Sequence, residues 1–440
     1  MMVSLNKTTA VFSILMLVLC SAAKAQEQAT LSLSEALHIA STRQVKVIVA
    51  NERVNQALSR IDQNISPLLP QISAEASEKR QTRDLRSTGF SFPGGPLVGP
   101  FNVFDARVSL TQTIFDGAAL SRLQASREGY ALSIAESRKA EQDALVLVAN
   151  FFIESRRSSE SLKVYDAMLR QDKKNLAITY SRLKSGLSSQ LEMKKVRAAY
   201  AKSLFSWQDA KTQALERQLD LYAALGLSRE HNIRLVWDEE ILQKDISFAD
   251  TSLESQLDVV VAQENFNLAR EQNVVEKRGF WPKVSVMGDY GPSGLSPNNK
   301  DSSETYSVGV KATVPLFEGG ARQAHIKETE SRVRENESAL KDVKRHAEAK
   351  ILTSSEVVKR AQALLIQMDA DISVAQEEYT LAKRKLRNGN GNSLDLTKAE
   401  VQLALRKDEK GEAVAFYFLA KVDQARANGR VKDFLSSNTK

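Results

Sequence analysis

The residues that could perform catalysis or bind a metal are few and scattered in this sequence. No two histidines have the spacing of metal ligands, and they stand at His38, His231, His325 and His346. The sequence also lacks a phosphate-binding glycine loop and a strand–nucleophile–helix motif. We therefore expect no enzymatic activity, no cofactor and no metal site.

Two glycine-containing segments are the next candidates for a functional role. Arg182-Leu-Lys-Ser-Gly186 and Lys385-Leu-Arg-Asn-Gly389 lie 203 residues apart, and each follows a long run without helix breakers. Glycine after such a run is typical of a helix that ends in the left-handed conformation. Asp395 follows the second segment, where a carboxylate would be favoured by the dipole at the start of a helix.

These segments must be positioned by very long helices. The stretch from Ala321 to Asn388 contains 68 residues without proline or glycine. From Leu340 to Leu386 its apolar positions step by threes and fours, and only Ser354 interrupts them. This spacing averages close to 3.5 residues, as in a supercoiled helix that packs along a partner. At 1.5 Å per residue such a helix is roughly 100 Å long.

The chain carries one pattern twice. All nine prolines lie in the windows 67–100 and 282–315, and each window holds two stretches that alternate apolar and polar residues. Alternation of this kind predicts strands with one apolar face. Phe115-Asp-Gly117 and Phe317-Glu-Gly319, which follow these strands, lie 202 residues apart. The agreement with the 203-residue spacing of the helix ends indicates an internal duplication.

The first residues have the pattern of a secretory signal. Lys7 precedes an apolar run from Val11 to Cys20, and Ala23-Lys-Ala25 has the small residues of a cleavage site. A membrane-anchoring helix is the competing interpretation, but about ten apolar residues are fewer than the roughly 20 that a span needs. Cleavage removes the single cysteine, so no intramolecular disulfide is expected. It also lowers the formal charge from +7 to +5, and such mild, interspersed charge argues against nucleic-acid binding.

We expect the following layout. Residues 1–25 are the signal peptide, 26–226 the first repeat, 227–251 an equatorial strand-and-turn segment, 252–428 the second repeat and 429–440 a tail. The first repeat comprises a helix over 31–66 capped by Ser34, a strand pair over 68–116 with an exposed loop over 90–100, a long helix over 118–185 and a return helix over 190–225. The second comprises a helix over 252–278, a strand pair over 281–316, a long helix over 320–388 and a return helix over 393–428.

Four strands with one apolar face cannot span a bilayer alone, because an open sheet leaves unpaired backbone groups in lipid. Two, three or four copies would close a barrel of 8, 12 or 16 strands, and only the larger barrels leave room for a channel. The fold class is therefore mostly α with a membrane β-barrel. The alternative is a periplasmic coiled-coil protein without a pore, such as an adaptor or a structural rod.

The order and spacing of several motifs resemble those of the TolC-type outer-membrane efflux protein family, over residues 31–428. The segments that carry the resemblance are Leu33-Ser-Glu-Ala-Leu37-His-Ile-Ala40, Leu69-Pro-Gln-Ile-Ser73, Gln112-Thr-Ile-Phe-Asp-Gly117, Lys184-Ser-Gly186, Trp281-Pro-Lys-Val-Ser285, Val314-Pro-Leu-Phe-Glu-Gly-Gly320, Arg387-Asn-Gly389 and Leu394-Asp-Leu396. The resemblance implies a homotrimer with a 12-stranded barrel in the outer membrane of a Gram-negative bacterium and a helical tunnel through the periplasm. It also implies a passive export channel for drugs, metabolites or type I protein secretion, with a periplasmic adaptor and an inner-membrane transporter as partners.

The resemblance further implies roles for residues near the two helix ends. Adaptor contacts would fall at Ser185, Gly186 and Leu187 in the first tip and at Asn388, Gly389 and Asn390 in the second. The family places two acidic rings at the pore constriction; Asp395 matches the first, whereas the second position is Lys398 here. Glu192 matches an acidic residue that helps to hold the tip closed, but the positions of its family partners, Tyr and Arg, are Leu386 and Gly391. A different closure of the tip is therefore expected.

Overall fold

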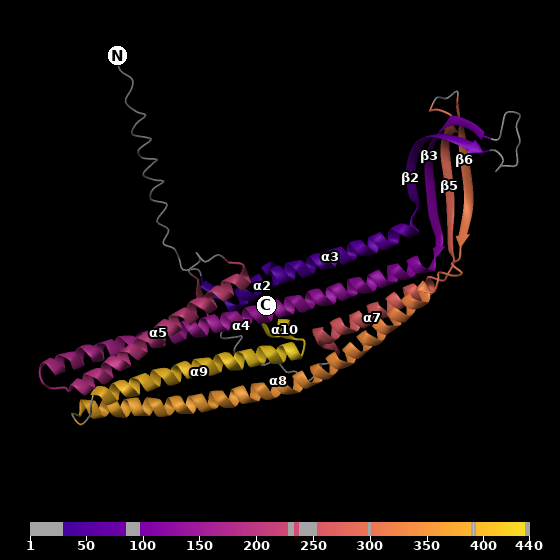
Figure 1. Cartoon of the computed structure of the whole chain (residues 1–440). Coiled ribbons are helices and arrows are strands. Elements are labelled where there is room, and N and C mark those ends of the chain that lie inside the picture. The colour runs from indigo at the N-terminus through magenta and orange to yellow at the C-terminus, as the bar shows by residue number, and fades with distance from the viewer. Residues whose placement is uncertain are drawn as a thin grey trace, which may run out of the picture.

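The computed structural model describes residues 30–84, 97–227, 233–236, 253–297, 301–388, 390 and 393–435. Its shape is a long rod, with a β-sheet at one end and two helical tips at the other (Figure 1). The expected signal peptide and nearly all of the expected equatorial segment lie outside the described residues. The sheet, the helices, the first tip and part of the second tip are thus available to test the remaining expectations.

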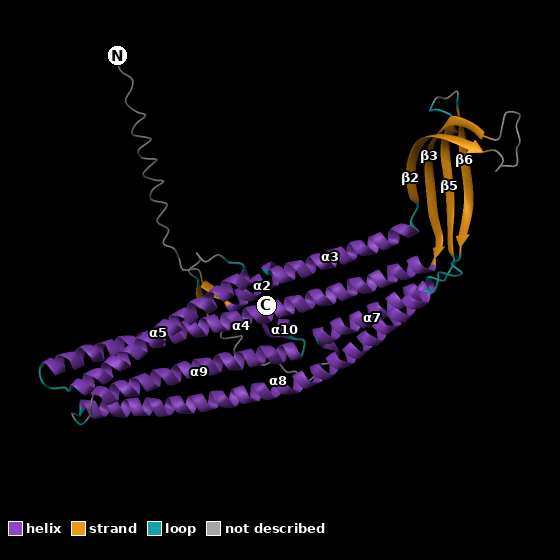
Figure 2. Ribbon diagram, viewed as in Figure 1, coloured by secondary structure: helices purple, strands orange, loops and turns teal. Residues whose placement is uncertain are grey.

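Four helices make up most of the rod (Figure 2). In the first repeat α4 spans Gly117–Lys184 and α5 spans Gln190–Leu225; in the second, α8 spans Ala321–Arg387 and α9 spans Ser393–Ala427. The long helices have 68 and 67 residues and the return helices 36 and 35. None of the helices in the described ranges is both long and apolar enough to cross a membrane. The near-equal lengths show that the second hairpin repeats the first.

The predicted apolar stripe of α8 is confirmed. Every position of the stripe between Leu340 and Leu386 is buried or half-buried. Ser354, the one polar member, is buried as well, and its hydroxyl donates a hydrogen bond of 2.9 Å to the backbone carbonyl of Ile351. A serine that satisfies its hydroxyl within its own helix can occupy a buried position at little cost.

The opening segment differs from the expected single helix over 31–66. It forms α2, Leu33–Arg43, and α3, Val45–Ile65, with Gln44 extended between them at φ −66° and ψ 131°. In the second repeat α7, Leu257–Arg278, likewise begins after an extended glutamine, Gln256, at φ −68° and ψ 125°. The break therefore makes α3 a counterpart of α7, with 21 and 22 residues.

The expected cap at Ser34 is also wrong. Ser32 caps α2: its Oγ accepts a hydrogen bond of 3.2 Å from the N–H of Glu35, whose carboxylate accepts one of 2.9 Å from the N–H of Ser32. Both residues satisfy a backbone donor of the other, as in a capping box. The helix begins at Leu33, so the buried leucine falls in its first turn.

Four of the described strands form one antiparallel sheet. The strands are β2, Gln71–Asp84, β3, Leu97–Asp116, β5, Lys283–Gly294, and β6, Ser302–Thr313, and they pair in the order β2-β3-β5-β6. The first four residues of β3, 97–100, lie within the segment that we expected to be an exposed loop. The two repeats thus meet at the centre of the sheet, and β2 and β6 are its edges.

The largest core lies halfway along the rod. There α2, α4, α5, α9 and the short α10, Val431–Leu435, pack around side chains that are almost inaccessible to water, including Leu33, Phe152, Leu221, Phe418 and Phe434. A small parallel pair of β1, Thr30–Ser32, and β4, Arg234–Val236, lies beside it. Between this core and the sheet, α3 packs on α4, and α7 packs on both α4 and α8.

We predict that Phe152→Ala destabilises the protein by about 3–5 kcal/mol, because a fully buried aromatic side chain is replaced by a cavity. Chemical unfolding of the purified protein, followed by circular dichroism, measures the loss. Phe151→Ala is the matched control, since Phe151 is only half-buried at the margin of the same core. Equal losses in the two variants would contradict the assignment of Phe152 to the centre of the core.

Candidate functional site

The long helices α4 and α8 and the return helices α5 and α9 lie side by side in one layer. Their order across the layer is α5, α4, α9 and α8, because α4 packs on α5 and α9 while α8 packs on α9 (Figure 1). The inner contact, between α4 and α9, joins the first repeat to the second. The layer therefore has two open edges, α5 and α8, as the sheet has β2 and β6.

The first tip is a tight helix-to-helix turn. Gly186 is left-handed at φ 72°, its N–H donates to the carbonyl of Leu183 at 3.1 Å, and the N–H of Leu187 donates to the carbonyl of Arg182 at 2.8 Å. This pair of bonds is the Schellman motif that ends many helices. Ser185 is the C-cap of α4, and Leu187 projects with 76% of its surface exposed. A single exposed leucine does not by itself mark a binding surface, so the adaptor contact expected at Ser185, Gly186 and Leu187 stays a prediction.

Glu192 is held within the first tip. Its N–H donates to Ser189 Oγ at 3.1 Å, and its carboxylate accepts a hydrogen bond of 2.7 Å from Ser188 Oγ. Both contacts stabilise the start of α5, which begins at Gln190. The role of Glu192 in closing the tip stays a prediction.

The second tip repeats the turn of the first where it can be compared. Asn388 is the C-cap of α8, and the N–H of Asn390 donates to the carbonyl of Lys385 at 3.0 Å, as Leu187 does to Arg182. Leu386 is half-buried in the last turn of α8. Gly389 and Gly391 lie outside the described residues, so their predicted roles as tip residues stay predictions.

Asp395 and Lys398 both lie in the first turns of α9 and are exposed. Between them Thr397 is buried against α4, and its Oγ1 accepts a hydrogen bond of 3.2 Å from Gln171 Nε2. Because Thr397 faces α4, this contact fixes the rotation of α9 about its own axis. It therefore determines where the two exposed charges lie.

Two more polar contacts join α4 to α9 farther from the tip. Ser161 Oγ donates a hydrogen bond of 3.1 Å to Asp408, and Arg426 donates one of 2.7 Å to Asp143. Together with the Gln171–Thr397 bond they form what we call the seam. Sequence reasoning missed all three pairs, because they join residues more than 200 positions apart that no local pattern connects.

The seam contains an acid in an unfavourable environment. Burial against α4 raises the pKa of the Asp408 carboxyl above its ordinary value, and the hydrogen bond from Ser161 opposes this shift. The same burial, reinforced by the charge of Asp408, raises the pKa of the Tyr165 hydroxyl. Asp408 therefore packs against α4 more favourably when protonated.

The sheet has two different faces. On one face the side chains are apolar and yet exposed, with Tyr306 78%, Val308 77%, Val310 72% and Ile72 72% accessible. Register partners on neighbouring strands share a face, so Val108 and Tyr290 belong with Tyr306. The alternate residues, such as Ser109, Asp289 and Ser307, form the opposite, polar face. The predicted alternation is confirmed.

Histidine, cysteine, aspartate and glutamate do not gather into groups of three or more that could hold a metal ion anywhere in the described ranges.

The sequence profile of the outer membrane efflux protein family matches residues 23–227 and 249–414, which is most of the chain. The chain belongs to this family. Membership agrees with the expectation of a transport protein rather than an enzyme, and it places the protein in the outer membrane.

Relatives with assigned roles are distant in sequence. The pyoverdine export outer membrane protein OpmQ of Pseudomonas putida is 23% identical over 418 residues, covering 90% of this chain and 85% of the relative. The proteases secretion protein PrtF of Dickeya chrysanthemi is 19% identical over 322 residues, covering 68% and 67%. The crystal structure of the CmeC outer membrane channel of Campylobacter jejuni superposes with a TM-score of 0.77 at 16% identity, covering 91% and 86%. This last similarity shows that this chain has the same fold as CmeC.

We predict that Asp408→Asn stabilises the efflux protein at neutral pH and reduces its gain in stability on acidification. A carboxyl whose pKa is raised by folding contributes stability below its unfolded pKa and loses it as the pH rises through the folded pKa. Asparagine can still accept the hydrogen bond from Ser161 but carries no charge to bury. Thermal unfolding at pH 4 and pH 7 measures both effects, with the exposed Glu400→Gln as control.

We also predict that Asp395→Ala and Lys398→Ala shift the ion selectivity of the reconstituted protein in opposite directions. Removing the acid should lower the preference for cations and removing the base should raise it, because each charge would contribute to the potential of the constriction that the family resemblance implies. Reversal potentials in planar bilayers under a salt gradient measure the shifts. Unchanged selectivity in both variants would remove these residues from the constriction.

Proposed function

We propose that the protein is the outer-membrane channel of a tripartite export system, assembled from three copies of the chain and conducting substrates passively. The observation that carries the proposal is the pair of open edges in both layers. In the sheet these edges are β2 and β6, and in the helical layer α5 and α8. The first repeat supplies one edge of each layer and the second repeat supplies the other.

The sheet cannot lie in a membrane as a single chain. Its exposed apolar face suits lipid, but the outer sides of β2 and β6 carry backbone groups without a neighbouring strand in the described sheet. Such groups are costly in hydrocarbon, and closure of a barrel removes them. Pairing β6 of one copy with β2 of the next satisfies both edges. Three copies then form the 12-stranded barrel that the family resemblance implies.

The helical layer has matching unpaired faces. On α8 a second apolar series lies away from the buried stripe, with Leu352, Ile366, Val374 and Leu381 between 52% and 73% exposed. On α5 Leu191, Phe205 and Leu219 follow one another at intervals of 14 residues and are 63%, 73% and 36% exposed. The intervals on α5 are multiples of seven, and those on α8 are 14, 8 and 7 residues, so each series stays on one face of its helix and predicts contact with another helix. A copy that presents α5 to the α8 of its neighbour buries both series.

The contact between copies is head-to-tail, because a first-repeat edge meets a second-repeat edge. Contacts of this kind form a closed ring when the rotation between copies closes. A closed ring of helical layers continues the barrel as a tunnel. The tips at its far end then carry Leu187 and the exposed charges of α9, which supports them as the contact region for a periplasmic adaptor and its inner-membrane transporter.

The relatives indicate the range of cargo. One is named for pyoverdine export and another for protease secretion, so the family serves both small molecules and proteins. We propose the same range of export for this channel, with the inner-membrane transporter selecting the cargo.

The proposal predicts heat-resistant trimers in the outer-membrane fraction and ion conduction after reconstitution into planar bilayers. Electrophoresis without boiling, after separation of the membranes, tests the first point, and current recordings test the second. Recovery of the protein as a water-soluble monomer would contradict the channel and favour a coiled-coil protein without a pore.

Ile366→Asp is expected to weaken the trimer while leaving the fold of one copy intact. Ile366 is 73% exposed in the single chain, so aspartate is tolerated there, but burial between copies would cost about 2 kcal/mol or more per contact. Crosslinking and unboiled electrophoresis measure the trimer fraction. Gln367→Asp is the matched control, since Gln367 is an exposed polar neighbour outside the apolar series. Equal trimer fractions would place the face of α8 that carries Ile366 outside the interface.

A further inference from the structure

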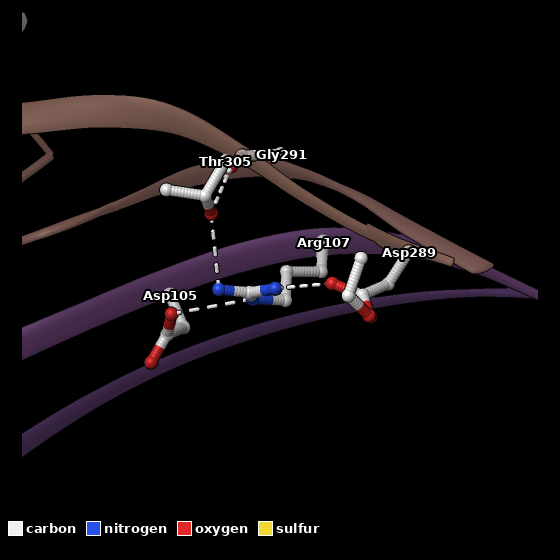
Figure 3. A network of polar contacts seen from close by, with 6 residues as sticks. Asp105, Arg107, Asp289, Gly291 and Thr305 are labelled. Atoms are coloured by element: carbon white, nitrogen blue, oxygen red, sulfur yellow. Dashed lines mark hydrogen bonds and ion pairs between the residues drawn. The ribbon is translucent and has the colours of Figure 1, made fainter. Parts of the chain in front are cut away.

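A network of charged side chains crosses the polar face of the sheet (Figure 3). Arg107 on β3 forms an ion pair with Asp289 on β5 and lies 3.4 Å from the carboxylate of Asp105. Its Nη2 also donates a hydrogen bond of 3.1 Å to Thr305 Oγ1 on β6. One guanidinium thus contacts three of the four strands.

Gly291 lies beside this network, where the backbones of β3 and β5 approach closely. Gly291 of β5 is the register partner of Thr305, so Arg107 must pass over it to arrive at β6. A Cβ at position 291 would lie 2.0 Å from the carbonyl oxygen of Ala106, which leaves no room for a side chain between these strands. Thr305 in turn donates a hydrogen bond of 3.2 Å to the carbonyl of Gly291. The backbone of β5 therefore fixes the position of the Thr305 hydroxyl that Arg107 contacts.

The network belongs to a band that is acidic as a whole. Glu75 on β2 is the register partner of Arg107, and it shares the polar face with Asp105 and Asp289. Three successive rows of that face thus carry three carboxylates and one guanidinium. Two further charges on the face lie close to these rows. Lys79 stands in the row next to that of Asp105 and its charge acts on Asp105, whereas Lys311 lies two rows from Asp289. The formal charge of the band is −2 in each chain.

The charged side chains of the band are accessible to solutes. The side chains of Arg107, Asp105 and Asp289 remain 32%, 36% and 26% exposed in the chain, so water reaches them despite the ion pairs. Arg107 holds two of the carboxylates in fixed positions, whereas the sheet alone positions Glu75. Fixed charges inside a narrow pore impose a potential on ions that pass.

We propose that Glu75, Asp105, Arg107 and Asp289 form a selectivity ring in the barrel, distinct from the constriction at the periplasmic tips. The inference rests on the proposed trimeric channel, in which the polar face of the sheet lines the lumen. Three copies bring a formal charge of −6 to one level of the barrel, which favours cations and cationic portions of a cargo. Arg107 limits this preference by neutralising part of the charge.

The test is the cation-to-anion permeability ratio of the reconstituted full-length protein under a potassium chloride gradient. Glu75→Gln should lower the ratio roughly two-fold, and Arg107→Gln should raise it by a similar factor, since each changes the ring by three charges. Asp289→Asn should lower the ratio as well. Ser77→Ala, a neutral change on the same polar face, is the control and should leave the ratio unchanged.

Further variants distinguish an effect of these charges on permeating ions from a purely structural role of Arg107 in joining the strands. Arg107→Lys keeps the charge but loses the forked contacts, so it should lower the heat resistance of the trimer and retain the ratio. If Arg107→Gln fails to assemble, Glu75→Gln decides alone, because the contacts of Arg107 in the described sheet are with Asp105, Asp289 and Thr305 and not with Glu75. Conduction with an unchanged ratio in Glu75→Gln overturns the ring. No conduction by the parent protein would instead contradict the proposed channel.

Discussion

The constraint on which the structure depends is that each layer of the chain is left open at both sides. The sheet ends in β2 and β6, and the helical layer ends in α5 and α8. Both layers expose apolar side chains that a water-soluble monomer would bury, such as Tyr306 on the sheet and Ile366 on α8. Neither problem can be solved within one chain, because the first repeat already meets the second at β3–β5 and at α4–α9. The trimer proposed above would remove both problems at once, because each copy would cover an open edge of the next.

The two repeats differ at the joints where their strands lead into the long helices α4 and α8. In the first repeat Asp116 caps α4 through the N–H of Ala119 at 2.9 Å and also pairs with Lys283 of β5 at 3.5 Å. Trp281 stacks on Phe115 and packs so closely on Gly117 that a Cβ there would lie 2.7 Å from the indole. In the second repeat α8 instead follows the left-handed Gly319 and Gly320, and Glu318 binds Arg322 with two hydrogen bonds of 2.8 and 2.9 Å. The first joint is locked by contacts between repeats, whereas the second relies on local ones.

Features governed by local patterns could be predicted from the sequence, and features governed by pairing could not. The stripe of α8, the glycine that ends α4 and the alternation of the strands follow from the periods of helix and strand and from the left-handed conformation of glycine. The break at Gln44 carries no proline or glycine, so only the packing of α3 as a counterpart of α7 reveals it. The seam and the Arg107 network depend on the register between segments far apart in sequence. The sequence pattern shows Asp105, Arg107 and Asp289 on polar faces of their strands, but the order of the strands decides that they meet.

The strength of the contact between the two hairpins changes along the rod. Near its middle α4 and α9 share an apolar core, in which Phe152 and Phe418 are fully buried. Toward the tips the polar contacts of the seam that the structure describes are Ser161–Asp408 and Gln171–Thr397. Hydrogen bonds of this kind contribute about 0.5–1.5 kcal/mol each, less than a single buried aromatic side chain. Within each hairpin, by contrast, apolar stripes such as that of α8 continue almost to the turn. The two hairpins are therefore joined by an apolar core near the middle of the rod and by these polar contacts toward the tips. In the proposed trimer, contacts between copies would add to the free energy that holds the tips together.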